Sequence, residues 1–145
     1  DPAMKTMLFS VLTFIALTAC GNAPKKQSTD AAPKNCVEVL SFHGKQRCAT
    51  CIAIEKSTKE VVEKEFAQQI KDGKIYFRII DISKPENEAL ADKYEVTWSS
   101  LLINKLQDGE ETVNNLTEFA FANARSNPEK FKVGLKAEIE KLLTE

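Results

Sequence analysis

The stretch that decides the fold is VEVLSFHGKQRCATC, which runs from Val37 to Cys51. Its first part, residues 37–42, is a short apolar run with β-branched members, and such a run predicts a strand. Beyond it, apolar side chains recur at helical spacing among lysines and glutamates, which predicts a helix. They are Ile52, Ile54, Thr58, Val61, Val62, Phe66 and Ile70. The motif Cys48-Ala49-Thr50-Cys51 therefore lies where a strand passes into a helix.

This position favours a thiolate at Cys48. Unpaired N–H groups and the positive end of the helix dipole stabilise a negative charge at a helix start. Lys45 and Arg47 add positive charge close to it. With two residues between them, Cys48 and Cys51 lie one helical turn apart, which is close enough for a disulfide. We therefore predict a redox-active pair; the competing interpretation is an inert structural disulfide.

Length and composition are those of an ordinary globular protein. The chain has 145 residues, of which 43% are hydrophobic and 28% charged, and its net charge is −1. The length suits one domain with a substantial core. No basic stretch is long enough to indicate a nucleic-acid partner.

The N-terminal region has the pattern of a lipoprotein signal. Residues 1–3 are interpreted as an expression remnant before Met4. Residues 7–19 are almost wholly apolar and, at about 13 residues, too short for a membrane-spanning helix, which needs roughly 20. They end in Leu17-Thr18-Ala19-Cys20, which resembles the bacterial lipobox, whose cysteine is lipidated before cleavage. Residues 4–19 are thus a predicted signal peptide and Cys20 a predicted lipid anchor; the alternatives are a plain secretory signal and an uncleaved anchor.

The anchor predicts a protein of the cell envelope that faces the periplasm, where disulfides persist. Residues 20–35 are rich in Ala, Pro, Lys, Ser and Asn without apolar periodicity, which is typical of a flexible tether. It either lets the domain reach partners near the bilayer or is a plain spacer. The folded domain is predicted to cover residues 36–145.

The remaining elements follow from local signals. Lys71-Asp72-Gly73 ends the first helix, and residues 75–82 form a near-continuous apolar run of the kind found in a central parallel strand. A short helix opened by Pro85 comes next, followed by a strand over 99–105, a turn at Gln107-Asp108-Gly109 and a strand over 111–116. The segment over 118–126 is ambiguous. The last helix is capped by Asn127, and the apolar residues on one of its faces are Phe131, Leu135, Ile139 and Leu142.

The predicted order is therefore β-α-β-α-β-β-α, an α/β fold with a four-stranded mixed sheet flanked by helices. A helix between the first two strands requires a parallel crossover, and the Asp-Gly turn makes the last pair antiparallel. The cysteine pair then lies at the C-terminal edge of the first strand, where open α/β sheets place their sites.

From about residue 37 to 143 the chain resembles the thioredoxin-like superfamily in its minimal form. Within it, the chain is similar to small bacterial lipoproteins catalogued as nitrophenyl compound nitroreductase subunits. The resemblance implies dithiol–disulfide exchange with a protein dithiol or disulfide partner: Cys48 attacks and Cys51 resolves the mixed disulfide. It implies no cofactor beyond the redox-active disulfide. The narrower similarity implies an accessory subunit of a reductase, because the chain has no flavin-binding pattern of its own.

The chain departs from the family pattern beside the cysteines. The tryptophan before the motif is replaced by Arg47, and the Gly-Pro inside it by Ala49-Thr50. The buried acid of the first strand corresponds to Ser41, whereas the basic residue of the second strand is kept as Arg78. We expect Arg78 to reach the surface or to pair with a carboxylate such as Asp81 or Glu55.

The loop that faces the pair contains Trp98, Ser99 and Ser100. Its family counterpart has a cis-proline, whose place falls on Ser99 or Ser100. A cis bond before a residue other than proline costs about 3–4 kcal/mol, so we expect trans peptides here. Trp98 is expected either to form a wall facing the substrate or to pack in the core.

The sequence permits two other hypotheses for the function. Cys48, Cys51 and His43 have a spacing that permits binding of Cu(I) or Zn(II) by two thiolates and an imidazole, in a metal-binding or delivery module. A redox-inactive interaction domain is the third possibility. Cys36 lies about six residues and roughly 20 Å from the motif end of its strand, so we expect it to lie outside the disulfide, as a core residue.

Overall fold

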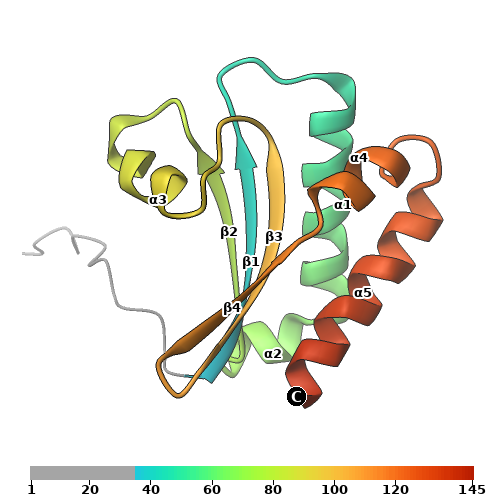
Figure 1. Ribbon diagram of the computed structural model, residues 1–145. Helices are drawn as coiled ribbons and strands as arrows, with labels where there is room; N and C mark the ends of the chain where they lie inside the picture. The colour runs from blue at the N-terminus through green and yellow to red at the C-terminus, as the bar shows by residue number, and fades with distance from the viewer. Residues whose placement is uncertain (1–34) are drawn as a thin grey trace, which may run out of the picture. The chain divides into compact units, whose positions relative to one another are not determined.

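The fold is built around a four-stranded mixed sheet with the strand order β2-β1-β3-β4 (Figure 1). The computed structural model describes residues 35–145, and the predicted signal peptide, the Cys20 anchor and the tether up to residue 34 lie outside them. The elements are β1 (Asn35–His43), α1 (Ala49–Glu65), α2 (Ala67–Lys71), β2 (Ile75–Asp81), η1 (Pro85–Asn87), α3 (Glu88–Lys93), β3 (Ser100–Gln107), β4 (Glu110–Asn115), α4 (Thr117–Asn123) and α5 (Pro128–Thr144). This arrangement confirms the predicted α/β fold class.

The pairing of the strands follows the predicted connections. β1 is parallel to β2, which it reaches through α1, and antiparallel to β3. β3 and β4 form a hairpin in which Gln107 pairs with Glu110. The two residues between them, Asp108 and Gly109, have φ values of 53° and 83°. Two consecutive positive φ angles are typical of the tight hairpin turns that match the right-handed twist of the strands.

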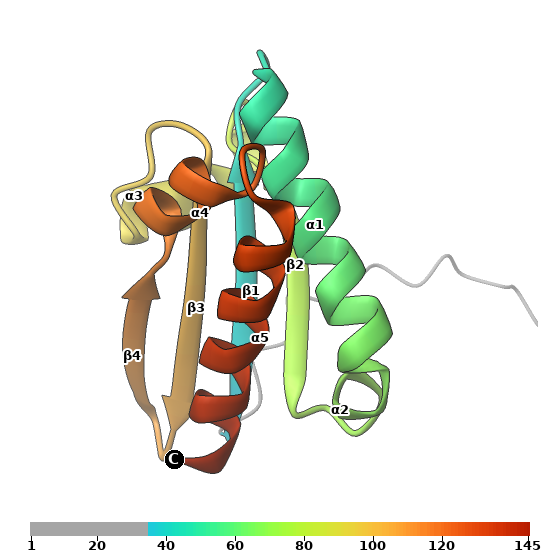
Figure 2. The same cartoon turned by 90° about the vertical axis from the view of Figure 1, so that its right-hand side faces the viewer.

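Both faces of the central strand β1 are covered, because its side chains alternate between two cores. Val37 and Val39 belong to the core beneath α1 and α5, while Leu40 and Phe42 belong to the core beneath α3. Figure 1 shows α3 on one side of the sheet and α1 on the other. Figure 2 shows α1 and α5 side by side over the sheet. The sheet is therefore the middle of three layers, with α1 and α5 over one face and α3 over the other.

The last helix packs on the sheet with the face that its sequence predicts. Phe131, Leu135, Ile139 and Leu142 are all buried, and the side chain of Asn127 caps the helix by accepting a hydrogen bond from the Lys130 N–H at 3.2 Å. Truncating one buried Phe or Leu in such a core costs on the order of 2–5 kcal/mol. The burial of α5 therefore supplies a large part of the stability of this face.

The prediction that residues 75–82 form a central strand is wrong. β2 is an edge strand, and its Tyr76, Arg78 and Ile79 side chains are exposed. An apolar run indicates a strand, but it does not give the position of that strand in the sheet. The order of strands depends on which strand β3 pairs with. Here β3 pairs with the free side of β1, so β1 and not β2 becomes central.

The first helix is also shorter than its apolar pattern suggests. α1 ends at Glu65, where Phe66 leaves helical geometry with a φ of −126°, and a separate short helix, α2, follows. Gly73 has a φ of 73°, as expected for the residue after a helix end. Ile52, the first apolar residue of that pattern, is 50% exposed. The ambiguous segment after Leu116 folds as α4.

Within residues 35–145, each helix is too short or too polar to span a membrane.

Candidate active site at the Cys48–Cys51 disulfide

Cys48 is the residue from which α1 begins. β1 ends at His43, a short loop follows, and Cys48 takes an extended conformation with φ −75° and ψ 164° as the N-cap of α1. Its Sγ accepts a hydrogen bond from the backbone N–H of Cys51 at 3.0 Å. The sulfur thus occupies the place of a capping side chain, beside the N–H groups that have no partner inside the helix. This is the predicted setting for a stabilised thiolate.

The two cysteines are joined in a disulfide, and their Cα atoms are 5.0 Å apart. Cys48 is exposed at the end of the loop, whereas Cys51 is half-buried on the first turn of α1. A partner sulfur coming from solvent therefore meets Cys48 first. The pair predicted from the sequence is assembled, and its two members differ in accessibility as the prediction of attacking and resolving residues requires.

The positive charge beside the pair is held in place. The guanidinium of Arg47 forms an ion pair with the carboxylate of Glu55 on α1. The sequence offered Glu55 as a possible partner of Arg78; Arg78 lies exposed on β2, which is the other position expected for it. Lys45 is exposed in the loop before Arg47. The ion pair places a negative and a positive group next to the disulfide. The local charge is therefore more balanced than Lys45 and Arg47 alone would make it.

The loop before β3 faces the disulfide across a cavity of about 620 Å³. The cavity is lined by Gly44, Gln46, Arg47, Cys48, Cys51, Thr97, Trp98, Ser99 and Phe121. Its residues come from the β1–α1 loop, the start of α1, the loop before β3 and α4. The site therefore combines segments that are far apart in the sequence.

Trp98 is 59% exposed and does not pack in the core. Its ring stacks on Phe121, with 5.0 Å between ring centroids and 26° between ring planes. Ser99 lines the same cavity, but Ser100 does not: it is the buried first residue of β3, and its hydroxyl donates to the carbonyl oxygen of Trp98 at 3.2 Å. All peptide bonds within residues 35–145 are trans, as expected for this loop.

Phe121 was missed by sequence reasoning. It lies in the segment whose local pattern was ambiguous, and it reaches the site only because α4 packs against α1 and β3. No spacing along the chain relates it to the cysteines.

His43 does not complete a metal site with the cysteines. Its Nδ1 is hydrogen-bonded to the carbonyl oxygen of Gly44 at 3.0 Å. Across the described residues, no three His, Cys, Asp or Glu side chains come together in a group that fits a metal ion. The three ligands of the alternative reading are therefore not assembled in this disulfide-bonded state.

Ser41 stands in β1 where thioredoxins have an acid. It is buried, and its strand neighbours are Ile79 and Leu101. The nearest carboxylate along α1 is that of Glu55, one helical turn beyond Cys51. We therefore expect proton transfer from Cys51 to use Glu55 or water in place of a buried acid.

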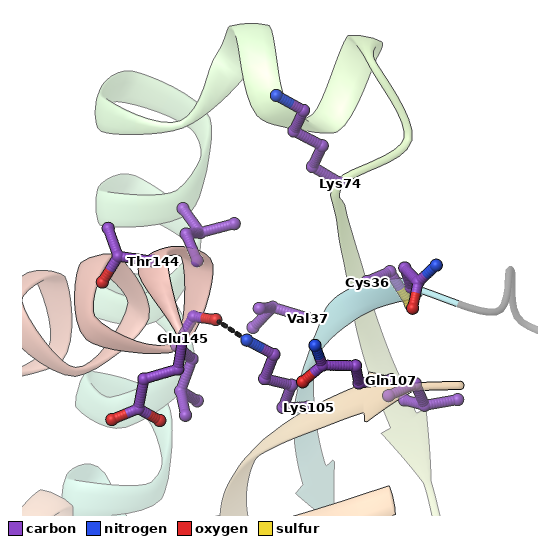
Figure 3. A pocket seen from close by; sticks show the side chains of 11 residues that line it. Cys36, Val37, Lys74, Lys105, Gln107, Thr144 and Glu145 are labelled. Atoms are coloured by element: carbon purple, nitrogen blue, oxygen red, sulfur yellow. Dashed lines mark hydrogen bonds between the residues drawn. The ribbon is translucent and has the colours of Figure 1, made fainter. Parts of the chain in front are cut away.

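Cys36 lies at the opposite end of β1 from the disulfide and is 6% exposed. Burial, helped by the nearby charge of Glu38, raises the pKa of Cys36 to about 11. A second cavity, of about 360 Å³, opens at this end, lined by residues of β1, β3 and the C-terminal end of α5 (Figure 3). There Lys105 donates a hydrogen bond from Nζ to the Leu142 carbonyl oxygen at 2.8 Å. Cys36 is thus a core residue outside the redox pair, as predicted.

No family model matches this chain, and no curated protein matches it. One similar solved structure is described as thioredoxin-2, a component of the malaria parasite protein secretion machinery; it is 23% identical, with a TM-score of 0.49, and the match covers 74% of this chain and 84% of that one. Another is described as a malarial protein; it is 21% identical, with a TM-score of 0.40, over 61% of this chain and 94% of that one.

The fold itself is thioredoxin-like on the strength of its own topology. The parallel β1–α1–β2 unit, the antiparallel β3–β4 hairpin on the other side of β1, and the closing helix α5 occur in the predicted order. The disulfide lies at the C-terminal edge of β1 and at the start of α1, where the resemblance placed it. The chain therefore has a thioredoxin-like fold with a Cys-x-x-Cys pair at disulfide distance.

Proposed function

We propose that the protein is a thiol–disulfide oxidoreductase that exchanges electrons with a partner protein through Cys48 and Cys51. The observation that supports this most directly is the exposed Cys48 sulfur at the N-cap of α1, bonded to the less accessible Cys51. A structural disulfide has no need of a helix start or of an open cavity beside it. The redox-active disulfide is the only cofactor this function requires.

In the reducing direction, the Cys48 thiolate attacks one sulfur of the partner disulfide. The partner's S–S bond breaks, a mixed disulfide forms, and the partner's other cysteine leaves as a thiolate. The Cys51 thiolate then attacks Cys48 Sγ and releases the reduced partner. The partner gains two electrons and, after protonation, two hydrogens, while the protein ends as the Cys48–Cys51 disulfide. Run backwards, the same steps oxidise a partner dithiol.

The reduction potential tests this function. Equilibration of the pair with glutathione redox buffers, read by alkylation and mass, is expected to give a potential between about −270 and −120 mV, the range of catalytic pairs. Matched Cys48→Ser and Cys51→Ser variants report the background. A potential below about −300 mV, together with no exchange with glutathione disulfide, would identify a structural disulfide and refute the proposal.

The finer parts of the proposal concern location. A lipid on Cys20 and a tether of residues 20–35 would hold the domain at a membrane of the cell envelope, facing the periplasm, close to membrane-bound partners. The supporting observation is the Leu17-Thr18-Ala19-Cys20 sequence after an apolar run. Cys20→Ser should release the protein from the membrane fraction of its native cell. Retention of the variant in that fraction would refute the anchor.

The narrower resemblance to nitrophenyl compound nitroreductase subunits suggests an accessory role beside a reductase. The chain would then pass electrons to, or regenerate the thiols of, a partner enzyme that reduces the nitroaromatic compound. Nitroaromatic reduction in cells that carry Cys48→Ser should fall below that of cells with the unaltered protein. An unchanged rate of nitroaromatic reduction would refute the accessory role beside a nitroreductase and would leave the general exchange function standing.

A further inference from the structure

Trp98 is the exposed aromatic residue at the edge of the catalytic cavity, and it is held in a fixed orientation. A tryptophan that is 59% exposed leaves apolar surface in water, which folding alone does not favour. Its stacking on Phe121, at 5.0 Å between centroids, fixes the ring plane from one side. We call this pair the aromatic shelf: Trp98 with Phe121 beneath it. The shelf offers a flat, preorganised surface beside the disulfide.

The shelf shares its cavity with both sulfurs. Cys48, Cys51, Trp98 and Phe121 all line the same space of about 620 Å³. A partner that brings a sulfur to Cys48 therefore places its neighbouring side chain over or near the ring of Trp98. The cavity has room for a side chain larger than the reacting sulfur.

The charge around the cavity indicates what kind of side chain fits. Arg47 is the charged residue among those that line the cavity, and Glu55 balances its charge; Lys45, exposed in the same loop, leaves the surroundings of the cavity positive. A lysine or arginine of the partner would be repelled by this charge, although its stacking on a tryptophan would otherwise be favourable. An uncharged aromatic or large aliphatic side chain gains the stacking without the repulsion.

We propose that the aromatic shelf is a specificity subsite, which selects partner proteins with an aromatic or large aliphatic residue next to the cysteine that Cys48 attacks. This inference rests on the exchange function proposed above and names the partner chemistry for the same site. The exchange step is unchanged: the partner S–S bond breaks, its second cysteine leaves as a thiolate, and the shelf holds the residue flanking the attacked sulfur.

The test uses the reduced protein and a set of short disulfide-linked peptides in which the residue beside the cysteine is Trp, Leu, Ser or Lys. Stopped-flow exchange rates should be about three- to tenfold higher for the Trp peptide than for the Ser peptide, as expected from one aromatic contact. The Lys peptide should be the slowest. Glutathione disulfide, which has no flanking apolar residue, reports whether exchange occurs at all.

Variants assign the preference to the shelf. In Trp98→Ala the ratio of Trp-peptide to Ser-peptide rates should fall to near one, while Trp98→Phe should restore part of it. Phe121→Leu should lower the ratio by loosening the ring. Tyr76→Ala, which removes an exposed aromatic residue from β2, is the matched control and should leave the ratio unchanged.

Exchange with glutathione disulfide but equal rates for the Trp and Ser peptides would overturn the subsite alone. A preference that survives Trp98→Ala would also overturn it. If the unaltered protein self-associates and Trp98→Ala does not, the shelf binds a second copy of the chain, and the proposed partner subsite is wrong. No exchange with any disulfide would refute the proposed function, and this inference with it.

Discussion

The guanidinium of Arg47, the residue before the first cysteine, forms an ion pair with the carboxylate of Glu55, which lies four residues after the second. Residues four apart in a helix lie on the same face, with about 5–6 Å between their Cβ atoms. Glu55 is therefore a neighbour of Cys51 on α1 and at the same time the partner of Arg47. The pair links the two sides of the motif and balances the charge that acts on the Cys48 thiolate.

Removing the charge of Glu55 and removing the charge of Arg47 should change the reactivity of Cys48 in opposite directions. Glu55→Gln removes a negative charge and leaves Arg47 available to the thiolate, so alkylation of Cys48 at pH 6 should become about two- to fivefold faster. Arg47→Gln removes the cation and should slow it. Iodoacetamide labelling of the reduced protein, followed by peptide mass analysis, measures both rates.

The matched control is Glu60→Gln, which breaks an ion pair with Lys64 and Lys132 farther along α1 and should leave the rate unchanged. Changes of the same sign in Glu55→Gln and Arg47→Gln would show that the ion pair does not set the charge at Cys48.

Replacing one cysteine at a time should separate attack from resolution. Cys51→Ser keeps the accessible Cys48 sulfur but cannot release a bound partner, so it should accumulate mixed disulfides. Cys48→Ser should accumulate few, because Cys51 is half-buried. Non-reducing gels of protein recovered from cells, followed by mass analysis, count the adducts. Equal trapping by the two variants, or more by Cys48→Ser, would reverse the assigned roles.

Cys36 should resist labelling in the folded protein. Its pKa of about 11 follows from burial and from the charge of Glu38. At pH 8 the thiolate is then roughly a thousandth of the total, and the buried sulfur is also shielded from reagent. In oxidised protein that carries Cys20→Ser, N-ethylmaleimide should modify Cys36 only after denaturation. Rapid modification of the native protein would show that this end of β1 opens readily.

Glu38→Gln should stabilise the protein at neutral pH. Glu38 is 8% exposed, and burial, followed by the charge of Glu111, raises its pKa above the usual range, against the opposing effect of Arg78 and Lys93. The folded state thus binds the Glu38 proton more tightly than the unfolded state does. The stability this proton supplies is present below the ordinary Glu pKa and is lost as the pH rises through the raised one.

The cross-strand partner of Glu38 strengthens this expectation. Asn104 lies opposite Glu38 in the β1–β3 pair, and its buried Oδ1 has no hydrogen-bond partner among the described residues. A glutamine at position 38 brings an amide donor to that face, and one such hydrogen bond adds about 1 kcal/mol. Urea unfolding between pH 4 and 8 measures the effect, with the exposed Glu110→Gln as control. A less stable variant at pH 7 would contradict the argument.

Gly134→Ala should destabilise the protein although alanine favours helices. A Cβ at this position of α5 would overlap the ring of Phe119 on α4. The gain in helix propensity is about 1 kcal/mol, whereas overpacking costs about 1–3 kcal/mol. Thermal unfolding should show a lower Tm, and Trp98 fluorescence should change because Phe121 lies on the same helix as Phe119. Adding Phe119→Leu should recover part of the loss; a higher Tm in the single variant would show that α4 moves freely.

Local signals explain most of what could be predicted. Val37 to Phe42, the Cys48–Cys51 junction, the Asp108-Gly109 turn and the Asn127 cap each depend on neighbours in the chain, and each was found where expected. The redox pair could be predicted for the same reason, because its two cysteines and the helix start that positions Cys48 lie within one short stretch of sequence.

The sequence by itself determined the order of the elements, the hairpin turn and the pair of cysteines at the start of α1, because short-range sterics and hydrogen bonding decide them. Only the tertiary structure decided that β1 is central and β2 an edge, that Glu55 pairs with Arg47, and that Phe121 supports Trp98. These relations join residues through space, and they depend on which faces pack together. A pattern of apolar and charged residues along one chain does not contain that information.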